Sequence, residues 1–183
     1  TIFSDNMMFQ QKKPINIWGY ATADKKISVK LYKKDAEIAS QDATMDESGK
    51  WTVTFPAHDA SYDTYKLEVY ENGKLFQTVN NILVGEVWVA GGQSNMALSV
   101  SVTQDAEDIY KNCNNDKIRV YIEPTKPTGD ISPMTPEKDI KGAYWGTGAT
   151  ATDIAKVSGV AYSMVKELQK KLIDQQAKAV VPL

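Results

Sequence analysis

The sequence is poor in the side chains from which many catalytic and metal sites are built. Among its 183 residues there is one cysteine, Cys113, and one histidine, His58. A single cysteine cannot form a disulfide within the chain, and a zinc site needs several cysteine or histidine ligands. The Gly-x-x-x-x-Gly-Lys sequence of a phosphate-binding loop is also missing. We therefore expect neither a metal ion nor an organic cofactor.

An excess of charge of either sign is missing as well, and so are long apolar runs. The 21 basic and 23 acidic side chains give a formal net charge of -2, and lysine pairs such as Lys25-Lys26 are scattered along the chain. This pattern predicts no nucleic-acid surface. No apolar run approaches the ~18 residues that span a membrane, and no signal peptide begins the chain. Because the first residue is Thr1 rather than methionine, we expect that the start of the protein was removed or left out.

Short strands are the main signal in the amino-terminal part. Apolar residues recur two apart over residues 15–17, 27–31, 51–55 and 65–69, which is the period of a strand with one buried face. Turn sequences separate these stretches, and Asn72-Gly73 is typical of a tight hairpin. Because no helical pattern lies between the strands, residues 1–82 are predicted to form a small antiparallel β-sandwich domain.

Residues 83–183 show a different pattern, in which strands alternate with helices. Residues 87–90 have the composition of a buried strand that ends in a glycine turn. A helix over 103–113, a strand over 118–122, an amphipathic helix over 157–172 and a strand over 179–183 are predicted to follow. Strand, helix and strand form the unit of a parallel sheet. The prediction is therefore the first half of a flavodoxin-like α/β domain, with the rest of its sheet still to come.

The stretch from residue 123 to 152 has no clear period, and it is longer than most connecting loops. Long loops beside a catalytic sheet often line the site. Trp145, within this stretch, could stack on a sugar ring or could pack the loop onto the core. The sequence leaves both interpretations open.

The main candidate site is the turn after residues 87–90. A turn from strand to helix is where several hydrolase folds hold a nucleophilic hydroxyl, which makes Ser94 the candidate nucleophile. Glycine, serine and asparagine are also ordinary turn and helix-cap residues. The Gly-x-Ser-x-Gly elbow of α/β-hydrolases is not present, because Met96 occupies the position of its second glycine. The expected nucleophile turn consists of Gly92, Gln93, Ser94 and Asn95.

A serine hydroxyl needs an adjacent base, usually a histidine that a carboxylate orients. The one histidine, His58, falls in a loop of the predicted sandwich, next to Asp59. Side chains of neighbouring residues rarely point at each other's reactive atoms, so this pair is not expected to act as a dyad. We expect His58 to be an exposed loop residue, and the sequence therefore does not identify a base for Ser94.

Several blocks together resemble a known family. Gly-Glu-Val-Trp at 85–88, followed by Gly-Gln-Ser-Asn-Met at 92–96, resembles the first conserved block of the SGNH hydrolases, and more narrowly that of the sialate O-acetylesterase group. Residues 4–10 and 14–19 resemble the amino-terminal signature of that group. Residues 158–162 and 166–168 resemble the first long helix of its catalytic domain. The resemblance extends over most of the chain.

The resemblance implies a serine esterase that removes O-acetyl groups from sialic acid or a related acetylated sugar, in a periplasmic or extracellular location. It makes Ser94 the nucleophile and the Ser94 backbone N–H an oxyanion donor. In this family the acid and the base form an Asp-x-x-His segment near the carboxyl end, and two further oxyanion donors come from later blocks. We therefore expect the chain to need a remaining carboxyl-terminal half and to be nearly inactive without it.

Two alternatives stay open. The chain could be a non-catalytic sugar-binding or structural module, in which the serine turn only shapes the backbone. It could also be part of an acetyl xylan esterase, with the same chemistry on an acetylated plant polysaccharide.

Overall fold

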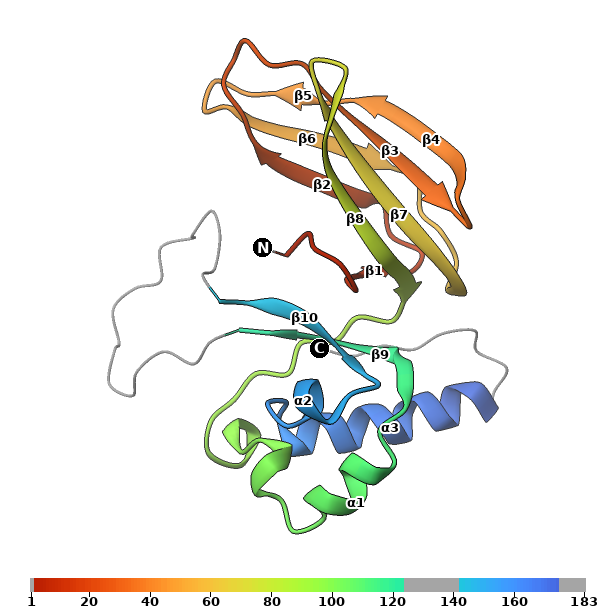
Figure 1. The fold of residues 1–183 in the computed structure, drawn as a ribbon, viewed down its shortest axis with the longest axis vertical. Coiled ribbons are helices and arrows are strands. Elements are labelled where there is room, and N and C mark those ends of the chain that lie inside the picture. The colour runs from red at the N-terminus through yellow and green to blue at the C-terminus, as the bar shows by residue number, and fades with distance from the viewer. Residues whose placement is uncertain (1, 124–141, 175–183) are drawn as a thin grey trace.

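The structure is a computed structural model, and it describes residues 2–123 and 142–174. Its amino-terminal part consists of two layers of strands (Figure 1). The rest, two further strands with the helices beneath them, follows as a second part. Within the described ranges, no helix is both long and apolar enough to span a membrane.

The larger layer is a five-stranded sheet in the order β1-β8-β7-β3-β4. Its strands are β1 (Met8–Gln10), β3 (Ile27–Lys33), β4 (Ala36–Asp42), β7 (Ser61–Glu71) and β8 (Lys74–Gly85). All pairs are antiparallel except β1 with β8, which is parallel. Asn72 and Gly73 both have positive φ, at 50° and 77°, so they form the tight turn between β7 and β8 that the sequence predicts.

The smaller layer is a three-stranded sheet in the order β2-β6-β5. It contains β2 (Ile15–Tyr20), β5 (Thr44–Met45) and β6 (Lys50–Phe55). Alternate residues of the two layers point inward, as the period of two requires, and they form one buried cluster that includes Ile17, Phe55, Leu31 and Leu67. The predicted antiparallel strands of the amino-terminal part are therefore confirmed.

In the second part, β9 (Asn115–Ile122) pairs with β10 (Tyr144–Gly148). The helices are α1 (Ala106–Lys111), α2 (Ala151–Ile154) and α3 (Gly159–Asp174), and two short 3₁₀ turns precede them, η1 (Ser94–Ala97) and η2 (Val100–Val102). A second buried cluster joins these elements through Val100, Ile118, Ile154, Tyr162 and Val165. Sheets and helices thus share one chain, and the coarse prediction of a mixed α/β protein is confirmed.

The parallel arrangement predicted for this part is not what the described residues show, because β9 and β10 are antiparallel. The sequence pattern also predicts no strand over 144–148, because glycines interrupt the apolar alternation there. Those glycines permit close approach: a Cβ on Gly148 would lie 2.7 Å from the Asn115 carbonyl oxygen, and one on Gly146 would lie 2.9 Å from Cγ of Asp153. The predicted strand over 179–183 lies outside the described residues.

Candidate active site around Ser94

Directly after β8, hydrogen bonds connect Glu86 and Val87 to the amino-terminal part of the chain. Glu86 accepts hydrogen bonds from the side-chain amides of Gln10, at 3.2 Å, and of Gln11. The Gln10 side chain in turn accepts a hydrogen bond from the Val87 backbone N–H, at 2.9 Å. Gln10 is the last residue of β1, and Gln11 follows it directly. These bonds bring two of the sequence blocks that resemble the esterase family into direct contact.

Beyond Val87 the prediction of a buried strand is wrong. Residues 86–93 form no strand, and the side chains of Val87, Trp88 and Val89 are 37%, 46% and 95% exposed. A strand is stable only where neighbouring strands accept and donate its backbone hydrogen bonds. In the part of the chain that the structure describes, no strand lies beside residues 87–90 to do this.

Ser94 opens η1 with an unusual backbone conformation. Its φ is +53°, in the left-handed region that a residue with a side chain seldom adopts. The preceding Gly92 has φ +155°, and a Cβ there would lie 3.1 Å from Cβ of Met96. The turn closes through a hydrogen bond of 3.1 Å from Met96 N–H to the Gln93 carbonyl. Strained conformations of this kind concentrate at functional sites, and Ser94 is exposed.

The first turn of α3 holds the serine turn in place. The Ser158 hydroxyl donates to the sulfur of Met96 at 3.3 Å, and Gly159 N–H donates to the Leu98 carbonyl at 2.8 Å. A Cβ on Gly159 would lie only 2.5 Å from Cγ2 of Thr103, so a larger residue would push the helix away. The block at 158–162, which resembles the family's first long helix, therefore contacts the turn around Ser94 directly.

A cavity of about 570 Å³ lies next to this turn. Gly92 and Met96, on either side of Ser94, belong to its wall, together with Trp88, Trp145, Lys156 and Ser158. A pocket of this size with mostly apolar walls and a few polar groups is typical of small-molecule sites. Ser94 is exposed between two residues that line this space, although Ser94 itself does not belong to the lining.

No base reaches Ser94 within the described residues. Its hydroxyl makes no hydrogen bond to another described side chain, and His58 packs elsewhere, with its ring centroid 5.5 Å from that of Tyr65. Burial lowers the pKa of His58, and the nearby charge of Lys33 lowers it further against the opposing effect of Asp59. His58 is half-buried rather than exposed, because it packs on the aromatic ring of Tyr65 in β7.

The other residues of the predicted site have different surroundings. Gln93 and Asn95 are exposed beside Ser94. Trp145 is only 8% exposed, and its indole N–H donates to the Ile2 carbonyl at 2.7 Å while its ring packs 5.2 Å from that of Tyr121. These contacts favour the interpretation in which Trp145 packs onto the core. Among the described residues, no group of histidine, cysteine, aspartate and glutamate side chains could hold a metal ion.

The sequence analysis missed Arg119, the one arginine of the chain. It lies on β9, fully buried, and its guanidinium donates to backbone and side-chain oxygens of Asn6 and Asn81 at 3.1–3.3 Å. Burial lowers the pKa of Arg119, and the charge of Asp116 opposes that effect. A lone arginine between Ile118 and Val120 in an apolar strand was the available signal. This contact joins the second part to the strand layers.

Comparison with known proteins gives a consistent result, although no family model matches the sequence. Over 125 residues the chain is 29% identical to a sialate O-acetylesterase of Rattus norvegicus and 28% identical to that of Mus musculus. Each match covers 65% of this chain and 23% of the relative. The chain therefore spans about a quarter of the length of these curated relatives.

Among solved structures, the chain is similar to a carbohydrate acetylesterase from Xanthomonas citri, with a TM-score of 0.77 and 26% sequence identity. That match covers 99% of this chain and 38% of the other. The sequence and structure matches agree, and they confirm the resemblance to the sialate O-acetylesterase group over part of the length of its members.

Proposed function

We propose that this chain, a relative of the sialate O-acetylesterase group, is the nucleophile-bearing part of a serine esterase that removes O-acetyl groups from sialic acid or a related sugar. The observation that most supports the proposal is the conformation of Ser94. A serine with φ of +53° is exposed on a turn at the edge of a cavity, in the sequence block that resembles the family's nucleophile block.

In the proposed reaction, the Ser94 hydroxyl oxygen attacks the carbonyl carbon of the acetyl group while a histidine takes the hydroxyl proton. The backbone N–H of Ser94 donates to the oxyanion that forms. The sugar oxygen leaves with the proton, and water then releases acetate from the serine. We place the histidine and its aspartate in residues of the complete protein outside this sequence, because His58 packs against Tyr65. The reaction needs no metal ion or organic cofactor, and we propose a periplasmic or extracellular location.

The test measures acetate release from O-acetylated sialic acid by the complete protein. Ser94→Ala should lower kcat/KM by about 10³-fold or more, because the covalent step is lost. Ser101→Ala is the matched control: Ser101 is another exposed serine, seven residues further on, and its variant should keep full activity. Retention of most of the activity by the Ser94→Ala protein would overturn the proposal.

The same assay separates the alternatives. Faster acetate release from acetylated xylan than from acetylated sialic acid would identify an acetyl xylan esterase. Saturable binding of the sugar by both the parent protein and the Ser94→Ala variant, with no acetate released by either, would identify a non-catalytic binding module. A fluorophosphonate probe adds a direct readout, since it should label the complete protein at Ser94 and leave the Ser94→Ala variant unlabelled.

A further inference from the structure

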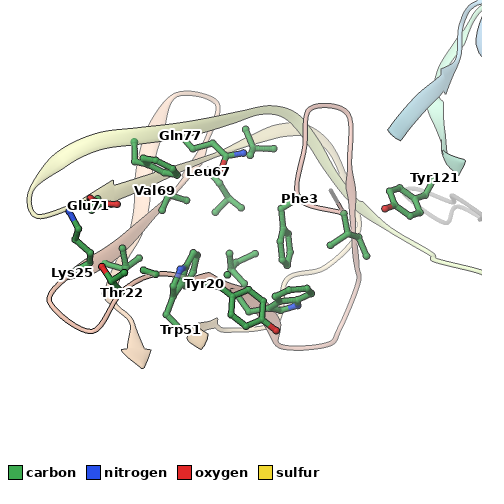
Figure 2. Close-up of a pocket in the computed structure, with 18 of the residues that line it drawn as sticks. Phe3, Tyr20, Thr22, Lys25, Trp51, Leu67, Val69, Glu71, Gln77 and Tyr121 are labelled. Atoms are coloured by element: carbon green, nitrogen blue, oxygen red, sulfur yellow. Dashed lines mark ion pairs between the residues drawn. The ribbon is translucent and has the colours of Figure 1, made fainter. Parts of the chain in front are cut away.

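A second cavity, of about 550 Å³, lies between the two strand layers (Figure 2). It is distinct from the space beside Ser94, but the two adjoin, since Ile2, Phe3, Tyr121 and Glu123 line both. A ligand with a group beside Ser94 could therefore extend past Phe3 into the space between the layers. Its binding would not require the esterase reaction, so the site goes beyond the function proposed above.

The floor of this second cavity is apolar, and aromatic rings form much of its wall. Buried Ile17, Leu67 and Val79 come from both layers. Trp18, Tyr20, Trp51 and Phe76 add four rings around the space, and Figure 2 shows Tyr20 and Trp51 on the side opposite Leu67 and Val69. Tyr20 and Phe76 are 41% and 68% exposed, so they form the accessible rim.

Contacts with other residues hold the rings of Trp18, Tyr20 and Trp51 in place before any ligand binds. The ring of Trp18 packs edge to face against Phe3, at 5.5 Å between centroids, and against Tyr20, at 6.3 Å. The ammonium of Lys50 lies 5.4 Å from the Trp18 centroid. At Gly19 a Cβ would lie 2.5 Å from the indole of Trp51, so only glycine lets this ring lie against β2. Rigid rings lose little conformational entropy on binding, which favours affinity.

Polar groups lie at the ends of the apolar space. At one end the Lys25 ammonium pairs with the Glu71 carboxylate at 2.7 Å, near Thr22, as Figure 2 shows. Gln77 supplies an amide, and Glu123 a further carboxylate near Tyr121. The site thus offers both donors and acceptors, and its one ammonium is already paired. Among the lining residues, a ligand carboxylate would meet two carboxylates and one lysine that is already paired, while Lys50 lies outside the lining, over the Trp18 ring, so the charges of the lining favour a neutral ligand.

We propose that this cavity binds a neutral pyranose ring of a glycan. The aliphatic C–H faces of such a ring match flat aromatic walls, while its hydroxyls can donate to Glu71 and to the Thr22 hydroxyl oxygen, whose own proton goes to Asp24, and can accept from Lys25 and Gln77. An uncharged apolar ligand would make no use of these donors and acceptors, and an anionic sugar would be repelled. The site then holds an unmodified sugar unit, next to the space where Ser94 lies.

The test is an NMR titration of the complete protein with xylotriose, a neutral pyranose oligosaccharide. Saturable shifts are expected for residues of the strand layers around the cavity, with the same affinity in the Ser94→Ala variant. N-acetylneuraminic acid should bind at least tenfold more weakly. Tyr20→Ala and Phe76→Ala should each weaken xylotriose binding about three- to tenfold.

Each variant has a matched control at an exposed residue that does not line the cavity. Tyr62 is 42% exposed, like Tyr20, but does not line the cavity, and Leu75 is the exposed neighbour of Phe76 on the other face of β8. Tyr62→Ala and Leu75→Ala should leave the affinity unchanged. All four side chains are exposed, so the fold should persist, and thermal melting checks this. No saturable shift at about 20 mM xylotriose, equal loss in the control variants, or tighter binding of N-acetylneuraminic acid would each overturn the proposal.

The xylotriose titration and the esterase assay can succeed or fail independently of each other. Loss of acetate release in Ser94→Ala with no xylotriose binding would support the esterase and reject the second site. Binding of xylotriose with unchanged esterase activity in Ser94→Ala would do the reverse.

Discussion

The guanidinium of Arg119 donates hydrogen bonds to both oxygens of Asn81, at 3.2 Å to its carbonyl and 3.1 Å to its side chain. The same guanidinium reaches Asn6, and the Asn81 amide donates to the Asn6 side-chain oxygen at 2.7 Å. Asn6 and Asn81 both have positive φ, at 69° and 54°, so their backbones are shaped to direct oxygens toward Arg119. Three residues distant in sequence thus fix the second part of the chain against the strand layers.

Replacing Arg119 should therefore destabilise the protein strongly. Arg119→Met removes four hydrogen bonds from a buried charged group to oxygens of Asn6 and Asn81, and we expect a loss of about 2–3 kcal/mol in the free energy of unfolding, measured by urea denaturation. Arg119→Lys should recover only part of this loss, because an ammonium cannot reproduce the planar fork. Lys117→Met, on the same strand but partly exposed, should change stability by less than about 0.5 kcal/mol. A similar effect of both Met variants would contradict this account.

Glycine at position 94 should make the protein more stable than alanine at the same position. Because φ at this position is +53°, Ser94→Gly is expected to raise the free energy of unfolding by about 0.5–1 kcal/mol relative to Ser94→Ala. Ser101 has a negative φ, and there the glycine variant should instead be less stable than the alanine variant. Thermal or urea unfolding of the four variants measures both differences. The same sign at the two positions would show that the Ser94 backbone is not strained.

Lowering the pH should reduce the stability of the protein, because Glu68, on the outer face of the larger sheet, becomes protonated. Its carboxylate accepts a hydrogen bond from the Tyr70 hydroxyl at 2.7 Å and pairs with Lys66 at 2.9 Å, and these contacts lower its pKa from 4.5 to about 2. A depressed folded-state pKa adds stability that is fully present above pH 4.5 and is lost as the pH falls toward 2.

Glu68→Gln should accordingly be less stable than the parent at pH 7, and the difference should shrink between pH 4.5 and 2. Urea unfolding at a series of pH values measures it. Glu47→Gln, on an exposed turn, is the control and should follow the parent curve. A difference that persists at pH 2 would mean that the ionised form of Glu68 is not what stabilises the sheet.

His58 should affect stability but not catalysis. Burial lowers its pKa below 6.5, so the stability that its neutral form contributes is complete above pH 6.5 and is lost as the pH falls through the lower folded-state value. His58→Gln should therefore flatten the loss of stability below pH 6.5. In the complete protein it should leave the pH profile of acetate release unchanged. A shift of that profile, or a loss of activity above tenfold, would make His58 the base.

Part of this architecture follows from local sequence alone. The alternation of Ile27, Val29 and Leu31 predicts a strand, because successive side chains of a strand point to opposite faces of the sheet. The Asn72-Gly73 sequence predicts the hairpin, because both residues accept positive φ. The apolar spacing of Ala161, Val165 and their neighbours predicts α3 for the same reason, with a period of 3.6. The resemblance of residues 92–96 to an esterase nucleophile block also came from the sequence, and the role of Ser94 stays a prediction.

Tertiary structure decided what depends on partners far along the chain. Trp145 packs against Tyr121 and Ile2, and Arg119 bonds residues 38 and 113 positions away, which no local pattern encodes. Residues 87–90 have the composition of a buried strand, yet Val89 is exposed, because a strand forms only where a neighbour supplies hydrogen bonds. The sequence by itself determined which segments favour strand or helix, and tertiary contacts decided which of them found a partner.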